Sequence, residues 1–260
     1  MTLPSEINPL IGIPPSYKIQ RSLNFSSSAP AYLSKTFGNG NRKTWTWSGW
    51  VKRRSINTTS PLMACNISTY ALHWFYFNSD NSLGMYFESD SGSYKTGWIT
   101  NSTFSDTSNW YHVVCAFDTT QAAVADRCKF YINGVLQSIY IFAYNQNYLP
   151  QNKDCFINTV GYNNYIGSGL GVYGYYFDGY IAEVNFIDGQ ALTASNFGAF
   201  NGSGAWRAKK YTSTYGTTGF YLNFNNTAST TTLGYDTSGN SNNWALNNIL
   251  LSDSSTISPA

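Results

Sequence analysis

The segment from Tyr176 to Thr193 constrains the fold most, because it places two turn signals around an alternating run of strand length. Asp178-Gly179 and Asp188-Gly189 flank the run with residues that tolerate a positive φ. The two-residue period predicts a strand with one buried face. The expected faces are Tyr180, Ala182, Val184 and Phe186 on one side and Ile181, Glu183 and Asn185 on the other. A single helical turn is expected after it at 192–197, capped by Thr193 or Ser195.

Other short runs of the same kind follow one another along the chain, separated by Asn, Ser, Asp and Gly. They lie at 22–25, 44–51, 71–77, 83–88, 110–118, 129–135 and 219–224. Within 129–135, Asn133-Gly134 between apolar residues is a strong hairpin signal. No segment has the length and pattern of a helix that could cross over a parallel sheet. The sequence therefore predicts an all-β fold, an antiparallel β-sandwich.

Composition favours recognition through neutral groups. Hydrophobic residues make up 42% of the 260 residues, which is enough for a large core, whereas charged residues make up only 11%, well below the usual quarter. The net charge is +2, and the dispersed cations give no stripe of the kind that nucleic-acid binding needs. The two densest basic runs, 52–54 and 207–210, are interpreted as solvated edges.

The chain contains no run of eighteen apolar residues, so no membrane insertion is expected. The prolines near the amino terminus interrupt any apolar signal sequence, and synthesis in the cytoplasm is therefore expected. The cysteines are widely spaced and are predicted to be free thiols, namely Cys65, Cys115, Cys128 and Cys155.

Residue sets for catalysis are missing. Glycoside hydrolysis uses two facing carboxylates, but the chain has only three glutamates, Glu6, Glu88 and Glu183, and Glu88 with Asp90 is the nearest approach to a pair. His73 and His112 both lie in strand patterns and are interpreted as structural imidazoles. Motifs for nucleotide binding and metalloproteolysis are absent. We therefore expect no enzyme activity, no catalytic residues and no cofactor.

Recognition is the remaining possibility, and the loop-rich section 144–175 carries its candidates. Tyrosine rings can lie against the apolar faces of sugars while side-chain amides bind the hydroxyl groups. The candidate glycan-binding residues are Tyr144, Asn147, Tyr162, Asn164, Tyr165 and Tyr173. The alternative is that these tyrosines pack against the sandwich or a neighbouring subunit.

Several motifs resemble those of one superfamily. Trp110 to Val114, Lys129 to Val135 and Phe177 to Val184 resemble the strands of concanavalin A-like lectin and laminin-G domains. The order of further motifs is similar to that in laminin-G-like virion proteins of tailed phages that infect cyanobacteria and marine bacteria; these motifs lie at 22–25, 44–53, 185–193 and 219–224. The resemblance spans about residues 20 to 245.

This resemblance implies a jelly-roll sandwich, expected at 21–244. Residues 1–20 are expected to form an extended arm, because their four prolines interrupt helix and strand, and residues 245–260 are expected to form a tail. The resemblance also implies a non-enzymatic structural protein located in the virion, as a tail fibre, appendage, head fibre or decoration protein. The implied partners are other virion proteins, further copies of the chain and a host-surface glycan, with no nucleic acid. A host-glycan adhesin is the alternative, and a glycoside hydrolase is the third.

Some relatives in the superfamily bind calcium through loop carboxylates and carbonyls. By that resemblance Asp118, Asp178 and Asp236 are candidate ligands, because each lies near a strand end. A role in hydrogen-bonded turns is the alternative for each of the three.

Overall fold

The computed structural model describes residues 17–68, 72–89, 94–169 and 174–259, which form two antiparallel sheets. In spatial order, sheet A contains β10 (Val135–Leu136), β9 (Cys128–Ile132), β8 (Tyr111–Asp118), β3 (Thr44–Arg53), β13 (Gly179–Asp188), β1 (Ser22–Phe25) and β18 (Ser254–Ser255), and β16 (Phe220–Leu222) also pairs with β13. Sheet B contains β11 (Ile139–Ala143), β7 (Lys95–Thr103), β6 (Ser82–Glu88), β5 (Leu72–Phe77), β4 (Ser60–Asn66), β12 (Asn163–Ile166), β2 (Tyr32–Thr36) and β17 (Ala245–Asn247). The predicted all-β antiparallel sandwich is confirmed.

The short elements lie mostly in the connections. A separate hairpin joins β14 (Gly198–Phe200) to β15 (Trp206–Ala208). The 3-10 turns are η1 (Val124–Asp126), η2 (Tyr144–Gln146), η3 (Ala194–Asn196), η4 (Thr231–Gly234) and η5 (Leu251–Asp253). The helical turn predicted near 192–197 is confirmed as η3, which has Thr193 at its N-cap position. Among the described residues, none of the helices has the length and apolar character needed to cross a membrane.

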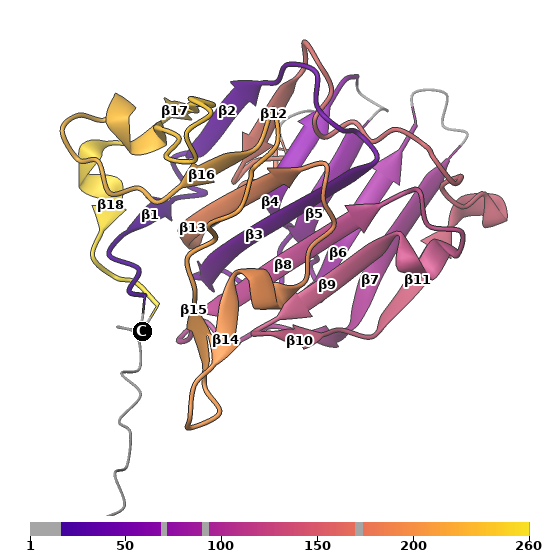
Figure 1. Ribbon diagram of the computed structural model, residues 1–260, viewed down its shortest axis with the longest axis horizontal. Coiled ribbons are helices and arrows are strands. Elements are labelled where there is room, and N and C mark those ends of the chain that lie inside the picture. The colour runs from indigo at the N-terminus through magenta and orange to yellow at the C-terminus, as the bar shows by residue number, and fades with distance from the viewer. Residues whose placement is uncertain (1–16, 69–71, 90–93, 170–173, 260) are drawn as a thin grey trace, which may run out of the picture.

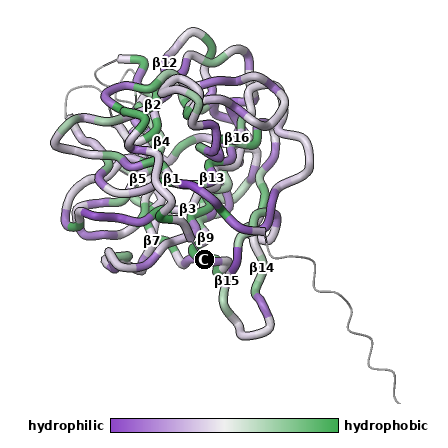
Figure 2. Tube along the Cα trace, turned by 90° about the vertical axis from the view of Figure 1, so that its left-hand side faces the viewer, coloured by the Kyte–Doolittle hydropathy of each residue, from purple (hydrophilic) through white to green (hydrophobic). Residues whose placement is uncertain are grey.

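The two sheets pack face to face around an aromatic core. Seen from the side, β5 and β7 lie in one layer and β13 and β16 in the other (Figure 2). Trp45 and Trp47 of β3 are fully buried between the layers. Phe75 of sheet B stacks on Phe130 of sheet A with ring centroids 5.9 Å apart. Alternation along these strands therefore supplies the core, as the sequence predicts.

Sheet A is also covered on its outer face. Ile187 of β13 and Val114 of β8 point away from the core and pack against Phe197, Tyr211 and Tyr215 from the segment that follows β13. In Figure 1 this segment, which includes η3 and the β14–β15 hairpin, crosses in front of β8 and β13. A sheet that is buried on both faces carries apolar side chains on both, so its strands alternate less clearly between apolar and polar residues.

The alternation predicted for 180–186 is wrong in its first half, because a β-bulge interrupts β13. The register with β3 shifts between Ala182 and Asn185, and Glu183 adopts a φ of 52°. The extra residue reverses the side-chain direction. As a result, Ile181 joins Val184 and Phe186 in the core, whereas Ala182 faces outward.

The boundary predicted at residue 244 also needs correction. Residues 245–247 form β17, which pairs with β2 in sheet B, and residues 254–255 form β18, which pairs with β1 in sheet A. This segment therefore completes both sheets, because its backbone satisfies edge groups of β1 and β2. Most of the predicted arm lies outside the described residues; of its end, Ile19 packs on Trp50 and Ala182.

One basic run does not have the solvated position expected from the sequence. Arg53 is only 1% exposed; its guanidinium lies 4.5 Å from the Phe77 ring and donates to the Phe104 carbonyl oxygen at 2.7 Å. Burial lowers the pKa of Arg53 to about 10. The aliphatic stem and planar head of arginine allow it to pack in this way at the margin of the core.

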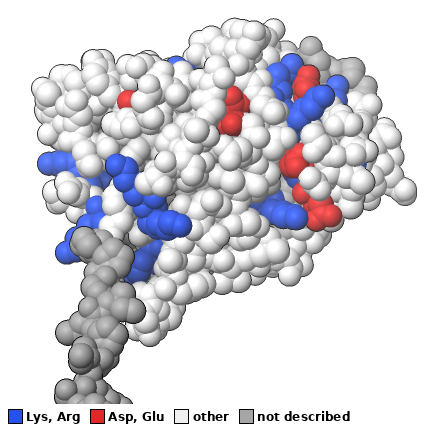
Figure 3. Space-filling view, in the orientation of Figure 1, with Lys and Arg blue, Asp and Glu red and all other residues white. Residues whose placement is uncertain are grey.

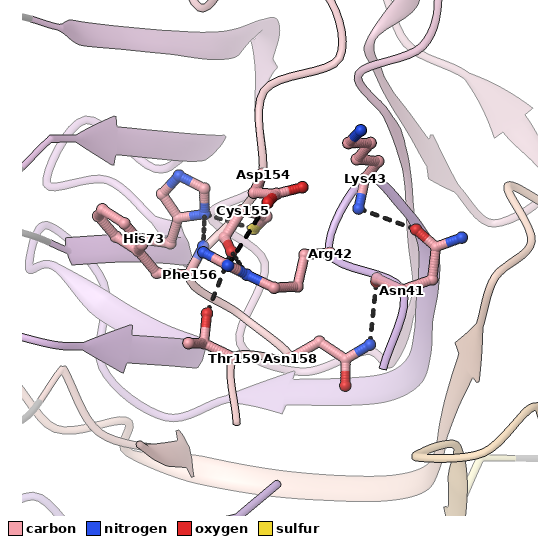
Figure 4. A network of polar contacts seen from close by, with 9 residues as sticks. All are labelled: Asn41, Arg42, Lys43, His73, Asp154, Cys155, Phe156, Asn158 and Thr159. Carbon is pink, nitrogen blue, oxygen red and sulfur yellow. Dashed lines mark hydrogen bonds and ion pairs between the residues drawn. The ribbon is translucent and has the colours of Figure 1, made fainter. Parts of the chain in front are cut away.

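A polar network joins the chain before β3 to the loop after β11 (Figure 4). Arg42 Nε donates to the Cys155 carbonyl oxygen at 2.8 Å, and Asn158 Nδ2 donates to the Asn41 carbonyl oxygen at 3.0 Å. The Cys155 thiol contacts His73 Nδ1, which also accepts from the Phe156 N–H at 3.2 Å. All four cysteines are buried free thiols, as predicted.

Candidate functional site

A groove on the outer face of sheet B is the candidate site. Alternation directs Phe75 and Phe77 of β5 into the core, so Trp74 and Tyr76 face outward. They line a groove of about 280 Å³ that we call the aromatic groove. Its main lining residues are Trp74, Tyr76, Tyr86, Glu88, Phe142 and Tyr175. This volume is near the lower end of the range for small-ligand pockets.

The rings of the aromatic groove hold one another in place. Trp74 makes edge-to-face contacts with Tyr76 and Tyr175, with ring centroids 6.3 and 5.8 Å away. Trp74 Nε1 donates to Asn66 Oδ1 at 2.9 Å, which satisfies its only polar group. Across the groove, Tyr86 stacks on Phe142 at 5.9 Å. Such mutual packing fixes the ring faces before any ligand arrives, which reduces the entropy lost on binding.

Phe142 lies directly against the backbone of β7. A Cβ atom added at Gly97 would lie 2.4 Å from the Phe142 ring, so only glycine allows this approach. The pairing of Phe142 with Gly97 places the ring over that position. The local sequence thus provides a wall of the groove by combining an aromatic residue on the edge strand β11 with a missing side chain on β7.

The polar groups of the groove are neutralised internally. Glu88 is buried, accepts from the Tyr86 hydroxyl at 2.8 Å and forms an ion pair with Lys95 Nζ at 2.6 Å. Burial raises the pKa of Tyr76 to about 12, so its hydroxyl stays protonated at neutral pH. Asn78 adds an amide at the margin. The groove therefore offers aromatic faces and hydrogen-bonding groups with little net charge.

The groove has only one carboxylate among its described lining residues, that of Glu88. Glu183 lies in β13 of the other sheet, and Glu6 and Asp90 lie outside the described residues. A pair of carboxylates that flank a scissile bond is the usual requirement for glycoside hydrolysis. The described part of the groove supplies aromatic and hydrogen-bonding groups and one of the two carboxylates.

The residues predicted from the loop 144–175 fall into two groups. Tyr144, 63% exposed, and Asn147 lie in and just after η2, next to β11. Tyr162 is exposed before β12, and Tyr165 on β12 packs edge-to-face on Tyr32 at 6.0 Å. The two groups flank opposite sides of sheet B, since β11 and β12 are five strand positions apart, or about 24 Å.

Two of the predicted residues have other placements. Asn164 is fully buried; its Oδ1 accepts from the Asn158 N–H at 3.3 Å, and its Nδ2 donates to the Tyr162 carbonyl oxygen at 3.3 Å. Its amide therefore holds the loop rather than facing solvent. Tyr173 lies outside the described residues.

The aromatic groove lies between the two groups, and sequence reasoning missed its residues. The sequence predicts a strand at 71–77, which corresponds to β5, but the aromatic residues on both of its faces did not enter the prediction of the site. A strand that covers a core on one side usually carries polar residues on the other. Trp74 and Tyr76 beside Phe75 and Phe77 therefore indicate a second apolar surface.

The candidate calcium ligands occupy hydrogen-bonded turns. Asp118 accepts from the Thr120 hydroxyl at 2.6 Å, Asp178 is paired with Arg54 at 2.7 Å, and Asp236 accepts from the Ser238 hydroxyl at 2.8 Å. Within the described ranges, no group of three or more His, Cys, Asp or Glu side chains could hold a metal ion.

Both histidines are buried. His112 Nδ1 accepts from Trp206 Nε1 at 3.0 Å, which leaves Nε2 to donate to the Ser48 hydroxyl, also at 3.0 Å. Burial lowers the pKa of His112 to about 3 and that of His73 well below its usual value. Both imidazoles are therefore neutral at pH 7, in agreement with the structural role predicted for them.

Comparison with known proteins identifies relatives of this fold. Residues 26–196 match the family model described as the concanavalin A-like lectin/glucanases superfamily. No curated protein matches the chain. Among solved structures, a protein from Bacteroides ovatus assigned to carbohydrate binding has a TM-score of 0.55 at 16% identity, over 89% of this chain. The chain spans 59% of the length of that protein.

Two further structures are more distant. A heptameric SAP-like pentraxin from Limulus polyphemus gives a TM-score of 0.47 at 16% identity, covering 68% of this chain and 80% of the pentraxin. The CBM40 of a Ruminococcus gnavus IT-sialidase, bound to α2,3-sialyllactose, gives 0.40 at 17% identity, covering 64% of this chain and 85% of the CBM40. At these identities the likeness concerns the fold.

Proposed function

The chain belongs to the concanavalin A-like lectin/glucanases superfamily, and on that basis we propose that it is a glycan-binding protein without catalytic activity. The saccharide lies in the aromatic groove. The observation that carries this proposal is the set of fixed aromatic rings on the outer face of sheet B, beside the internally neutralised Glu88. The Bacteroides ovatus structure assigned to carbohydrate binding supports the same function.

The chemistry of the groove fits an uncharged saccharide. The C–H faces of a pyranose are apolar and pack on rings such as Phe142 and Tyr86, while its hydroxyl groups exchange hydrogen bonds with Glu88 and Asn78. Because the charge of Glu88 is compensated by Lys95, the groove does not select strongly for cations.

Binding depends on the exposed edge of the groove. Replacing Phe142 or Tyr86 by alanine removes an aromatic face, and the lost apolar contact should weaken saccharide binding on the order of tenfold. Glycan-array screening followed by calorimetric titration of the best ligand measures this. Tyr144→Ala is the matched control, since Tyr144 is an exposed tyrosine outside the groove and a candidate from the sequence.

The result can contradict the proposal in two ways. Binding that survives Phe142→Ala and Tyr86→Ala but disappears with Tyr144→Ala or Tyr162→Ala would place the saccharide on the loops instead. A chain that binds none of the arrayed glycans would remove the function altogether. Thermal unfolding of each variant shows whether the fold is retained.

Absence of catalysis is part of the proposal and has its own measurement. Incubation of the protein with any polysaccharide that it binds should release no reducing ends. If reducing ends appear and are lost with Glu88→Gln, the protein is a hydrolase and the non-catalytic function is wrong.

We further propose that the glycan belongs to a host surface and that the protein acts as an adhesin on a phage particle. The motif order from 22–25 to 219–224 and the low charge content support this narrower setting. Reconstruction of purified particles should place the sandwich on an appendage or head fibre with the aromatic groove facing outward. A groove covered by neighbouring subunits would favour an assembly role without adhesion.

A further inference from the structure

We propose a second binding site on the opposite side of the sandwich, for an oligosaccharide that carries carboxylate groups. The site is a groove of about 640 Å³ on the outer face of sheet A, which we call the cationic groove. Its walls come from β3, the segment just before β8, the β14–β15 hairpin and residues 256–259. The residues that carry the inference are Trp50, Lys52, Trp110, Phe200, Trp206 and Arg207.

Two basic runs that are far apart in the sequence meet in this groove. Lys52 comes from the run at 52–54 and Arg207 from the run at 207–210, and the described lining contains no aspartate or glutamate. None of the four ion pairs found among the described residues involves Lys52. Figure 3 shows Lys and Arg gathered at the lower left, where Figure 1 places the hairpin and the chain end, while both signs mix at the right.

Aromatic rings form a rigid wall beside these cations. Trp206 stacks on His112 at 5.8 Å and donates to its Nδ1, and Phe200, 55% exposed, meets the Trp206 ring edge-to-face at 4.9 Å. Trp206 also lies on Gly134, where an added Cβ would approach the ring to 2.4 Å. The indole orientation is therefore fixed in part by His112 and Gly134, which do not line the groove.

Rings next to an ammonium and a guanidinium suit a ligand with apolar ring faces and anionic substituents. Guanidinium and ammonium groups form charge-assisted hydrogen bonds with carboxylates, and Trp110 and Phe200 offer surfaces for sugar C–H faces. A nucleic acid is less suited, because its affinity comes from neutralising many phosphates along an extended track. The volume lies within the range of single-ligand pockets.

The test compares two ligands that share one sugar backbone and differ in whether their carboxyl groups carry a charge. A trisaccharide of galacturonic acid and its fully methyl-esterified form are titrated calorimetrically into the full chain at about 50 mM salt. We expect the acid to bind at least about tenfold more tightly than the ester. Lys52→Gln should abolish most of this preference and Lys52→Arg should retain it, because the cation is needed. Raising the salt concentration should weaken binding of the acid and leave binding of the ester unchanged.

Lys129→Gln is the matched control, since it removes the same charge from β9, outside the cationic groove. It should leave the preference unchanged. Equal affinity for acid and ester, an equal effect of Lys129→Gln, or no binding of either ligand would overturn the proposal. So would tighter binding of a single-stranded oligonucleotide that is lost with Lys52→Gln, which would assign the groove to nucleic acid. These titrations test the cationic groove alone, so their outcomes do not depend on whether the aromatic groove binds glycans.

Discussion

Glu183 is the residue whose environment departs most from what its sequence position suggests. Its carboxylate is buried on the outer face of sheet A and accepts from the Tyr17 hydroxyl at 2.9 Å and the Tyr221 hydroxyl at 2.7 Å. Burial raises the pKa of Glu183 to about 7, against the opposing effect of these two hydrogen bonds. The folded chain therefore holds a proton here that the unfolded chain releases at lower pH.

The sign of the linkage follows from this shift. Because the folded pKa lies above the unfolded value, the stabilising contribution of Glu183 is complete below about pH 4.5 and is lost as pH rises through about 7. Relative to Glu183→Gln, the wild type should lose about 3 kcal/mol of unfolding free energy over this window. Urea unfolding of both proteins between pH 4.5 and 8 measures the difference, in which the histidine contributions cancel. A difference that does not change with pH would contradict the prediction.

For single residues, the sequence predicted roles that follow from a local strand pattern. It missed the burial of charged side chains, which depends on contacts with distant segments. The structural roles of His112 and Cys115 could be inferred, since both lie within the apolar strand pattern that becomes β8. The burial of Glu183 and Arg53 could not, because it requires Tyr17, Tyr221 and Phe77 from distant segments. Such contacts leave no local signature.

Among the elements, the β9–β10 hairpin illustrates a reliable short-range signal. Asn133 and Gly134 both have a positive φ, of 48° and 84°, and their pairing of β9 with β10 confirms the turn predicted from Asn-Gly. Its glycine serves two purposes, because the Trp206 ring of another hairpin lies against it.

Comparison of two glycines separates the effect of a positive φ from the effect of the contact with Trp206. Gly134 and Gly161 have similar φ angles of 84° and 80°, but a Cβ at Gly161 would meet nothing within 4 Å. Gly161→Ala should cost about 1 kcal/mol for the backbone alone. Gly134→Ala should cost a further 1–3 kcal/mol from the contact with Trp206. Denaturant unfolding of the two variants checks this, and equal losses would show that Trp206 moves aside freely.

The β13 bulge marks the limit of prediction at the element scale. The positive φ expected at Gly179 and Gly189, where glycine is its marker, is confirmed, and Gly189 lies in a turn. Gly179 does not lie in a turn, because it begins β13 and pairs with Arg53. The positive φ of Glu183 has no such marker, so the period-two reading continued through the bulge and assigned Tyr180 and Ala182 to the wrong face. One inserted residue is sufficient for that error.

For the whole molecule, the two grooves lie on the outer faces of different sheets, with the aromatic core between them. Each groove should bind its ligand without affecting the other, because a close-packed aromatic core separates them. The affinity for the acidic trisaccharide should be unchanged when the aromatic groove is saturated with its own ligand. Competition between the two ligands in sequential calorimetric titrations would show that they share one site.

The pairing of β1 with β18 has a consequence for how the chain reaches its native state. Ser22 is opposite Ser255, so two residues from nearly opposite ends of the sequence are neighbours in one ladder. During synthesis, the outer edge of β1 stays uncovered until β18 has been made, and that of β2 until β17 has been made. Contacts of such long sequence separation close slowly, because the entropy of a large loop is lost before they form. The nascent protein therefore needs protection from aggregation with other chains until residue 255 has left the ribosome.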